Sequence, residues 1–515
     1  MNRLDRTFTA LFLAVGSLAA ACGGSGSDPA GPDPGATPPP GSPGADAAPP
    51  EPPKAPVVTG TPDDSEINET LGIFVAPRGA ANGDGSRANP LLTVQAGIDR
   101  ARTLGKRVYV CTGTYKETLV IADSISVIAG LDCSAPIWKA GAPRSRIEAP
   151  TSPAILAKDI TSPTRLEGLD IVAPNVTAPG ASSIGFFADH AAGITLAKSS
   201  VKAGDAADGA NGTEGIQLVQ SASAVGQGRM PAELCIFGDL ICGPTSPQRK
   251  GSPGGVSVCT GAPNVSGGTG GRGGSGGRYT AVASGAGFVL AGVVLEAEFS
   301  GGEPRPEPAT IGASGTDGPP GAALGSLSAE GYAGAGGTAG TDGQGGGGGR
   351  GGGGALPNAP NAAGIWYGIG GAGGGAGGCP GLAGTPGGGG GASIALALIE
   401  SPLVVDGTQL TAGKGGAGGR GTFGSDPTPG ATPGAGFSAL PGGNGGFAGI
   451  STNGSSGPSI GILHSGPPAK LQAGGRATAS TGGAAVPEQS RTTFGTVRSI
   501  PATPAGLAQD ILAQQ

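Results

Sequence analysis

The chain has 515 residues, among them 109 Gly and 47 Pro, and 13% of its residues are charged. Average proteins contain about 12% Gly plus Pro and about 25% charged residues. This composition excludes a conventional helical enzyme, a coiled coil and a collagen along the whole chain. The net charge of −6 provides no basic surface, so we expect no nucleic-acid partner.

Residues 1–21 are predicted to be a signal peptide. A short basic start precedes the apolar run Thr7–Leu18, which is too short to span a bilayer as a helix. The following Ala19-Ala20-Ala21-Cys22 resembles a bacterial lipobox, in which the cysteine is lipidated and becomes the mature amino terminus. A lipid on Cys22 would anchor the protein to a membrane surface. The alternative is an ordinary signal peptide that is cut near Ala21, which would leave the protein secreted.

Residues 22–70 are expected to form a tether rich in Pro and Gly. The segment contains Pro38-Pro39-Pro40 and Pro49-Pro50 and almost no large apolar side chain. Such a segment cannot bury enough surface to fold, and its proline clusters keep it extended. We expect it to hold the folded part of the protein away from the membrane.

From residue 71 onward the sequence predicts short strands and one early helix. The helix is expected from about Leu92 to Leu104, because Val94, Ile98 and Ala101 fall on one face. Apolar runs with a period of two then recur every 22 to 25 residues, at Ile125, Ile147, Leu169 and Ile194. A repeat of this length, made of short strands and turns, is typical of a parallel β-helix.

The tract from Ile73 to Val201 resembles the right-handed parallel β-helix of the pectin-lyase-like superfamily, particularly its uncharacterised surface proteins. The resemblance rests on short motifs, among them Phe74-Val75-Ala76-Pro77, Asp84-Gly85-Ser86, Asn89-Pro90, Val108-Tyr109-Val110 and Gly113-Thr114-Tyr115. It implies an all-β solenoid whose early helix caps the open end of the coil, where strand edges would otherwise be bare.

The cysteines other than Cys22 are expected to form disulfides in an oxidising compartment. They number six: Cys111, Cys133, Cys235, Cys242, Cys259 and Cys379. Cys111 and Cys133 lie one coil apart, and coils stack at about 4.8 Å, so we predict that these two are bonded. The pairing of the last four stays open. No paired spacing typical of a metal site is present, and we expect neither a metal nor a cofactor.

The strand pattern returns after the glycine-rich tracts. Ser183-Ile184-Gly185 is echoed by Ser393-Ile394-Ala395 and by Ser459-Ile460-Gly461. We also align the coil ending Val201–Gly204 with Leu410–Gly413 and Leu471–Gly474, and expect Tyr279–Phe299 to supply further strands. The resulting organisation is a β-helix with its cap over 71–300, a Gly-rich insertion over 301–392, further β-helix coils with Gly-rich loops over 393–490 and a C-terminal tail over 491–515.

In the longest tracts glycine falls at every third position, as in the series from Gly331 to Gly352 and from Gly375 to Gly390. Three residues per turn is the period of polyproline II, so each series would line one edge of such a helix. Three interpretations stay open: packed polyglycine-like helices, flexible loops, or collagen, which the scarcity of Pro in these tracts disfavours.

Catalytic chemistry has weak support in the sequence. Asp132 and Asp170, each in a repeated Gly-Leu-Asp, are the best candidates for a carboxylate pair. An Asp in this position more often ends a strand and caps a turn, so we expect no catalytic residue. His190 follows Asp189 directly, and neighbours on a strand point to opposite faces, so we do not expect these two side chains to meet.

The sequence therefore favours a protein anchored by lipid on the outer cell surface, with a structural or adhesive role. Its expected partners are extracellular polysaccharide or surface matrix. The alternative is a secreted lyase, epimerase or hydrolase that acts on polysaccharide, as the resemblance to the pectin-lyase-like superfamily implies.

Overall fold

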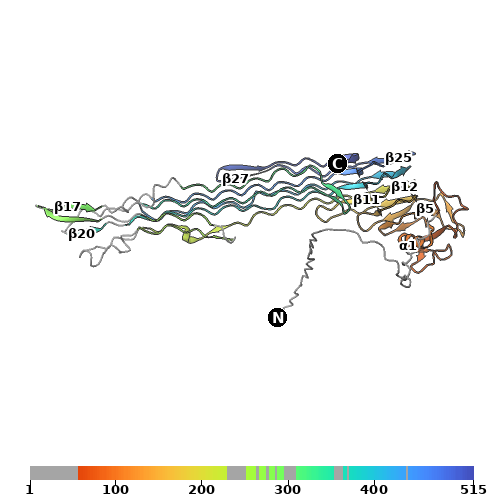
Figure 1. Cartoon of the computed structure of the whole chain (residues 1–515), viewed down its shortest axis with the longest axis horizontal. Helices are drawn as coiled ribbons and strands as arrows, with labels where there is room; N and C mark the ends of the chain where they lie inside the picture. Colours follow the sequence, from red (N-terminus) through yellow and green to blue (C-terminus); the bar gives the residue numbers. More distant parts are fainter. Residues whose placement is uncertain are drawn as a thin grey trace, which may run out of the picture. The chain divides into compact units, whose positions relative to one another are not determined.

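The computed structural model describes residues 56–228, 251–261, 266–273, 278–284, 287–294, 309–352, 364–367, 370–436 and 439–514. Over these ranges the protein is nearly all-β, with strands that stack mainly in parallel (Figure 1). The expected all-β class is confirmed. The predicted signal peptide, and the predicted tether up to residue 55, lie outside the described residues.

Three parallel sheets form a stack, which we call the three-sheet stack. The first sheet contains β1 (Gly72–Ala80), β2 (Arg107–Cys111), β5 (Val127–Asp132), β9 (Thr164–Glu167), β12 (Ile194–Ala197), β22 (Val404–Asp406) and β25 (Lys470–Gln472), and β6 (Lys139–Ala140) pairs with β5. The second contains β3 (Thr114–Tyr115), β7 (Ser145–Glu148), β10 (Leu169–Val172), β13 (Ser200–Lys202), β23 (Gln409–Thr411) and β26 (Arg476–Thr478). The third contains β4 (Leu119–Ile121), β8 (Ile155–Lys158), β11 (Ser183–Asp189), β21 (Ser393–Ile399), β24 (Ser459–Ser465) and β29 (Ala508–Ala513). The chain visits the sheets in turn, so each circuit adds one strand to each sheet.

Apolar side chains from all three sheets form one continuous core. In the third sheet, the register places Ile155, Phe186, Leu396 and Ile462 beside one another on successive strands, and all four are buried. Full burial of such a side chain stabilises the fold by about 1.5–3 kcal/mol. The period of two in the sequence thus arises because alternate residues of each strand enter this core.

The helix α1 (Val94–Leu104) packs against β1, β2 and β4 at the amino-terminal end of the stack. Val94, Ile98 and Ala101 are buried, which confirms the predicted face, although the helix begins two residues later than expected. A residue outside the helix caps its first turn, because the main-chain N–H groups of Val94 and Gln95 donate to the Glu117 carboxylate at 2.8 and 2.9 Å. Gly105 ends the helix in the left-handed region, with φ of 60°.

Residues with positive φ stack at the corner between the first and second sheets. Lys198 has φ of 46° and donates its main-chain N–H to Asp406 O, and one circuit later Gly407, with φ of 58°, donates to Gln472 O. Ala473, with φ of 47°, continues the column. The same left-handed turn is therefore repeated in successive circuits, and it does not depend on glycine.

The expected echoes between distant segments are strand neighbours. Ser183 pairs with Ser393, and Ser393 with Ser459, although 210 and 66 residues separate them along the chain. The alignment at the end of the third copy was wrong. Leu471 lies in the first sheet and pairs with Val405, whereas the true neighbour of Leu410 is Ala477. Both segments carry an apolar residue between polar ones, so the pattern alone does not distinguish the two sheets.

The expectation that Tyr279–Phe299 adds strands to the stack was wrong in its pairing. The strands β16 (Arg278–Ser284) and β17 (Gly287–Val294) exist, but they pair antiparallel with each other, and β16 also pairs antiparallel with β20 (Gly364–Tyr367). A two-residue connection permits an antiparallel hairpin, whereas parallel pairing needs a long crossover.

The remaining elements are short. The described part of the chain also has an antiparallel pair of β14 (Val219–Gln220) with β15 (Cys259–Thr260), the hairpins β18 (Ser326–Ser328) with β19 (Gly331–Ala333) and β27 (Gln489–Thr493) with β28 (Thr496–Ile500), and a 3-10 helix at Ala222–Ala224. The segment expected to be a C-terminal tail, 491–515, contains β28 and β29, and β29 pairs with β24.

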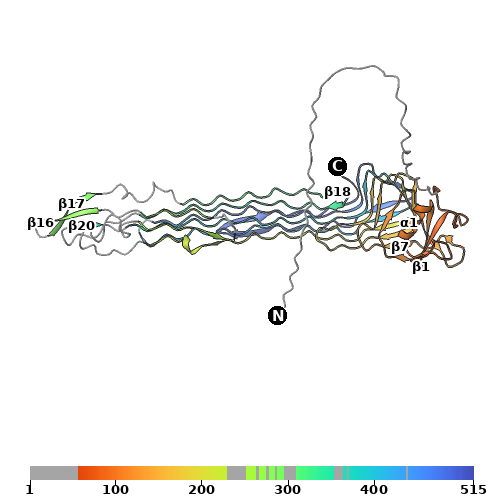
Figure 2. The same ribbon diagram turned by 60° about the horizontal axis from the view of Figure 1, so that its bottom comes forward.

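The Gly-rich tracts run side by side and hydrogen-bond to one another (Figure 2). They occupy the connections from β13 to β21, from β23 to β24 and from β26 to β29, so each leaves the second sheet and returns to the third. Gly387 donates its main-chain N–H to Thr452 O and Gly390 to Ser455 O, whereas Gly388 donates to Ala210 O. Donors three residues apart thus reach the same neighbouring tract, and the next residue reaches a different one. We call this set of tracts the glycine array.

Candidate functional site

The two aspartates of the repeated Gly-Leu-Asp lie in different sheets. Asp132 ends β5 in the first sheet and is exposed, and its Oδ1 accepts the main-chain N–H of Ser134 at 2.9 Å. Hydrogen bonds from the backbone and side chain of Ser134 hold the pKa of Asp132 below its usual range. Asp132 therefore caps the turn that follows its strand.

Asp170 lies in β10 of the second sheet, where the register places it between Arg146 and Ser200. Arg146 donates Nη1–H to Asp170 Oδ2 at 2.7 Å and Nε–H to Glu148 Oε1 at 2.7 Å, and the Ser200 hydroxyl donates to Asp170 Oδ1. Within the described ranges Asp132 and Asp170 share no hydrogen-bond partner. The structure does not bring them together as an acid–base pair.

The expectation that Asp189 and His190 point apart was wrong. The two side chains are hydrogen-bonded, with 2.7 Å between His190 Nδ1 and Asp189 Oδ1, and Lys158 Nζ lies 3.5 Å from Asp189 Oδ2. The strand β11 ends at Asp189, and His190 has φ of 51°, so alternation no longer applies at that point. The Asp189 carboxylate is thus buried, and the exposed side chains of Lys158 and His190 lie over it.

A second buried carboxylate, Glu167, was not anticipated from the sequence. Arg165 donates Nε–H to Glu167 Oε2 at 2.6 Å, the Thr61 hydroxyl donates to Oε1, and Lys198 Nζ lies 3.4 Å from Oε1. Burial raises the pKa of Glu167, but hydrogen bonds from Thr61 and Arg165 outweigh it, so the pKa lies below its usual range. This network fastens residue 61 to the face of the first sheet.

Two disulfides are present among the described residues. Cys111 and Cys133 are bonded as predicted, with 5.7 Å between their Cα atoms. Cys259 and Cys379 are bonded across 120 residues, which resolves part of the pairing that the sequence left open. Cys22, Cys235 and Cys242 lie outside the described residues.

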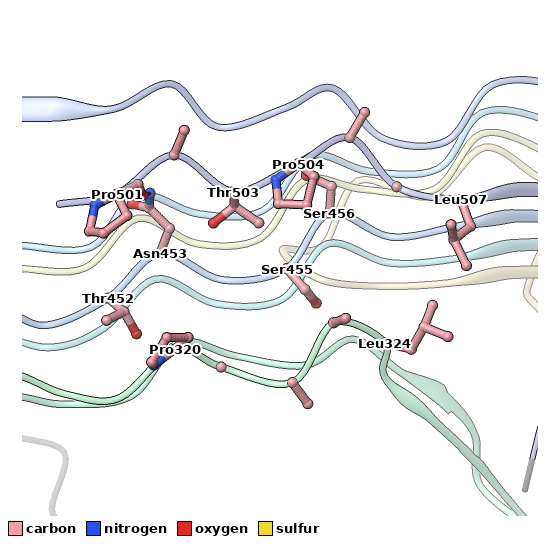
Figure 3. Close-up of a pocket in the computed structure, with 16 residues that line it drawn as sticks. Pro320, Leu324, Thr452, Asn453, Ser455, Ser456, Pro501, Thr503, Pro504 and Leu507 are labelled. Atoms are coloured by element: carbon pink, nitrogen blue, oxygen red, sulfur yellow. Dashed lines mark hydrogen bonds between the residues drawn. The ribbon is translucent and has the colours of Figure 1, made fainter.

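An open groove runs between three segments next to the glycine array (Figure 3). It has a volume of about 380 Å³, and its sides come from residues 320–324, 452–456 and 501–507. Pro320 and Leu324 lie on one side, and Pro501, Pro504 and Leu507 on the other. No charged side chain lines the groove, so it is suited to binding and not to acid–base chemistry.

Glycine allows the segments of the glycine array to approach closely. A Cβ atom on Gly454 would lie 2.0 Å from Gly388 O, and one on Gly419 would lie 1.9 Å from Ala210 O. A Cβ atom cannot lie this close to a backbone oxygen, and a backbone oxygen cannot rotate away as a side chain can. Only glycine therefore fits at these positions without moving the tracts apart. The glycines at every third position are therefore the contact edges of the array.

The described residues contain no group of three or more His, Cys, Asp or Glu side chains placed to hold a metal ion. None of the described helices has the length and apolar character required to cross a membrane. Comparisons of the chain with protein families, with curated proteins and with solved structures found no match.

Proposed function

We propose that the protein is anchored by lipid on the outer cell surface and has a structural or adhesive role there. In this proposal Cys22 carries the lipid, and the part of the 22–70 segment that precedes Thr61 tethers the folded part, because Thr61 and Ile67 already pack on it. The role fits a protein whose most extensive feature is a set of hydrogen-bonded Gly-rich tracts, because such an array offers a long and repetitive surface. The partners we propose are extracellular polysaccharide or surface matrix.

The proposed architecture is a right-handed parallel β-helix of the pectin-lyase-like type. The circuit of the chain through three parallel sheets supports it, as does the packing of α1 against the first strands. We further propose that the Gly-rich tracts are insertions in a polyglycine II-like conformation. The three-residue period of their main-chain hydrogen bonds, for example Gly378 to Gly443 O and Gly381 to Gly446 O, supports this conformation.

The observation that carries the structural role over catalysis is the separation of Asp132 and Asp170. Each has its own local partners: Ser134, in the turn after β5, for Asp132, and Arg146 with Ser200, in the second sheet, for Asp170. An acid and a base must both reach the substrate within hydrogen-bond distance. Carboxylates that are committed to different local partners do not meet this requirement.

A panel of cell-surface polysaccharides, assayed for both retention and product release, tests the proposal. Retention of at least one polysaccharide without released sugars is the expected result, whereas release of unsaturated or shortened sugars would establish the enzymatic alternative. Incorporation of labelled palmitate, with loss of the label in Cys22→Ser, tests the anchor separately.

A further inference from the structure

We propose that the groove between residues 320–324, 452–456 and 501–507 binds an extended peptide strand from a second protein. The strand would adopt the polyproline II conformation, with a small residue at every third position. This site depends neither on the lipid anchor nor on binding of polysaccharide, and it adds a polypeptide partner to the proposed role.

The first argument is the hydrogen-bond series that leads into the groove. Three residues of one tract, Gly312, Gly315 and Gly318, donate their main-chain N–H groups to Asn444 O, Phe447 O and Ile450 O at 2.8–2.9 Å. At the end of this series Ile450 N–H donates to Asp317 Oδ1 at 2.7 Å. Donors and acceptors on both tracts advance by three residues at a time.

The next two positions of the series are Asn453 and Ser456, which form part of the groove floor. Both residues are buried, with 5% and 4% exposure. Among the described residues, the backbone carbonyl groups of Asn453 and Ser456 accept no backbone hydrogen bond, whereas those of Asn444, Phe447 and Ile450 each accept one. At the neighbouring positions, the carbonyl groups of Thr452 and Ser455 accept from Gly387 and Gly390.

The reason for the missing partners is that the tract above them ends. After Gly318 the chain bends at residues 323–324 and continues into β18, so it no longer follows residues 453–456. An unpaired buried backbone group costs about 1–3 kcal/mol, and nearly all such groups in proteins find a partner. A strand that continued the series would supply N–H groups to these carbonyl groups at the required spacing.

The sides of the groove select the chemistry of that strand. Pro501 and Pro504 line one side of the groove with apolar rings, next to the methyl groups of Ala502 and Ala505. With no charged or aromatic side chain in the lining, an anionic ligand finds no counter-charge and a sugar ring finds no surface for stacking. A neutral peptide rich in Gly, Pro and Ala fits, because it is already extended and loses little entropy on binding.

The test uses the full-length protein and a fluorescent peptide of repeating Gly-Pro-Ala, about twelve residues and roughly 37 Å long in polyproline II. We expect saturable binding by fluorescence anisotropy. A peptide with Val in place of each Gly should bind at least about tenfold more weakly, because Cβ atoms at the contact edge prevent close approach. The variant Ala505→Trp, which fills the groove from its side, should lower the affinity by a similar factor.

Ala339→Trp is the matched control, since Ala339 is an alanine in a Gly-rich tract that does not line the groove. It should bind the peptide as the unmodified protein does. The proposal is overturned by an absence of saturable binding, by equal affinity for the Val peptide, or by unchanged affinity in Ala505→Trp. Displacement of the peptide by soluble polysaccharide fragments would also overturn it and would assign the groove to sugar. Retention of polysaccharide on the panel above is independent of each of these results.

Discussion

The main-chain N–H of Ala417 donates to Oδ1 of Asp208 at 2.7 Å, across a separation of 209 residues in the sequence. The same relationship recurs three residues to either side, from Lys414 N–H to Asp205 Oδ1 and from Arg420 N–H to Asn211 Oδ1. Gly209 N–H returns a bond to Ala417 O at 2.8 Å. Side-chain oxygens at every third position thus hold two distant tracts of the glycine array in one register.

Replacement of this side chain should loosen the register without preventing folding. We expect Asp208→Ala to lower the free energy of unfolding by about 1 kcal/mol, the usual net contribution of one hydrogen bond. Asp208→Asn keeps an acceptor oxygen and should lose less. Denaturant unfolding of the three proteins measures the difference, and equal losses in both variants would contradict the role of the acceptor.

Addition of one methyl group within the glycine array should cost more than loss of a hydrogen bond. The Cβ of Gly454→Ala would meet Gly388 O at 2.0 Å, so the two tracts must separate. We expect a loss of about 2–3 kcal/mol, as for overpacking of a tight interior. Gly60→Ala is the control, because Gly60 has no atom within 4 Å of the added Cβ. If both variants melt at the same temperature as the unmodified protein, the close packing of the array is refuted.

Loss of the disulfide between Cys259 and Cys379 should destabilise the glycine array more than the three-sheet stack. The bond closes a separation of 120 residues, and the chain-entropy model assigns a loop of that size about 4–5 kcal/mol. In the double variant Cys259→Ser/Cys379→Ser we expect proteolysis within the Gly-rich tracts while the stack stays intact. The variant Cys111→Ser/Cys133→Ser provides the comparison and should instead weaken the first sheet, since β2 holds Cys111. The same fragment pattern from both variants would count against this assignment.

The free energy of unfolding should decrease as the pH is lowered, and part of this decrease should depend on Glu167. Its pKa in the folded protein lies below the usual range, so its charged form contributes stability at pH values above about 4.3, and this contribution is lost as the pH falls through the lowered pKa. Glu167→Gln removes the titrating group. Urea unfolding at about pH 6 and about pH 3 should therefore show a smaller decrease for Glu167→Gln than for the unmodified protein. Equal decreases would mean that Glu167 is not stabilised in its charged form.

Much of the three-sheet stack could be predicted from local patterns. The buried positions Val94, Ile98 and Ala101 follow from helical spacing, and the pairing of Ser183 with Ser393 follows from an echoed motif. Both patterns arise because the same side of each element faces the core that the three sheets share. The pattern failed at Leu471, because β25 of the first sheet and β26 of the second both carry an apolar residue between polar ones, and Leu471 is exposed whereas Ala477 is buried.

The sequence could not predict contacts that depend on how distant tracts pack. The period of three in Gly375–Gly390 marks contact edges, but it does not say which tracts meet, so the bond between Cys259 and Cys379 stayed open. The groove needs three segments that are far apart in the sequence, and its unpaired groups at Asn453 and Ser456 belong to residues with no distinguishing pattern. A sequence signal does exist for the tract that ends above them, since the glycine period stops after Gly321.

Hydrogen exchange of the glycine amides tests the central claim, that the Gly-rich tracts form one hydrogen-bonded array. Gly381, Gly387 and Gly390 donate to neighbouring tracts, so their amides should exchange as slowly as those of β21, to which their tract leads directly. Exchange at the rate of an unstructured peptide in residues 375–391, with β21 still protected, would contradict the array and leave the tracts as flexible loops.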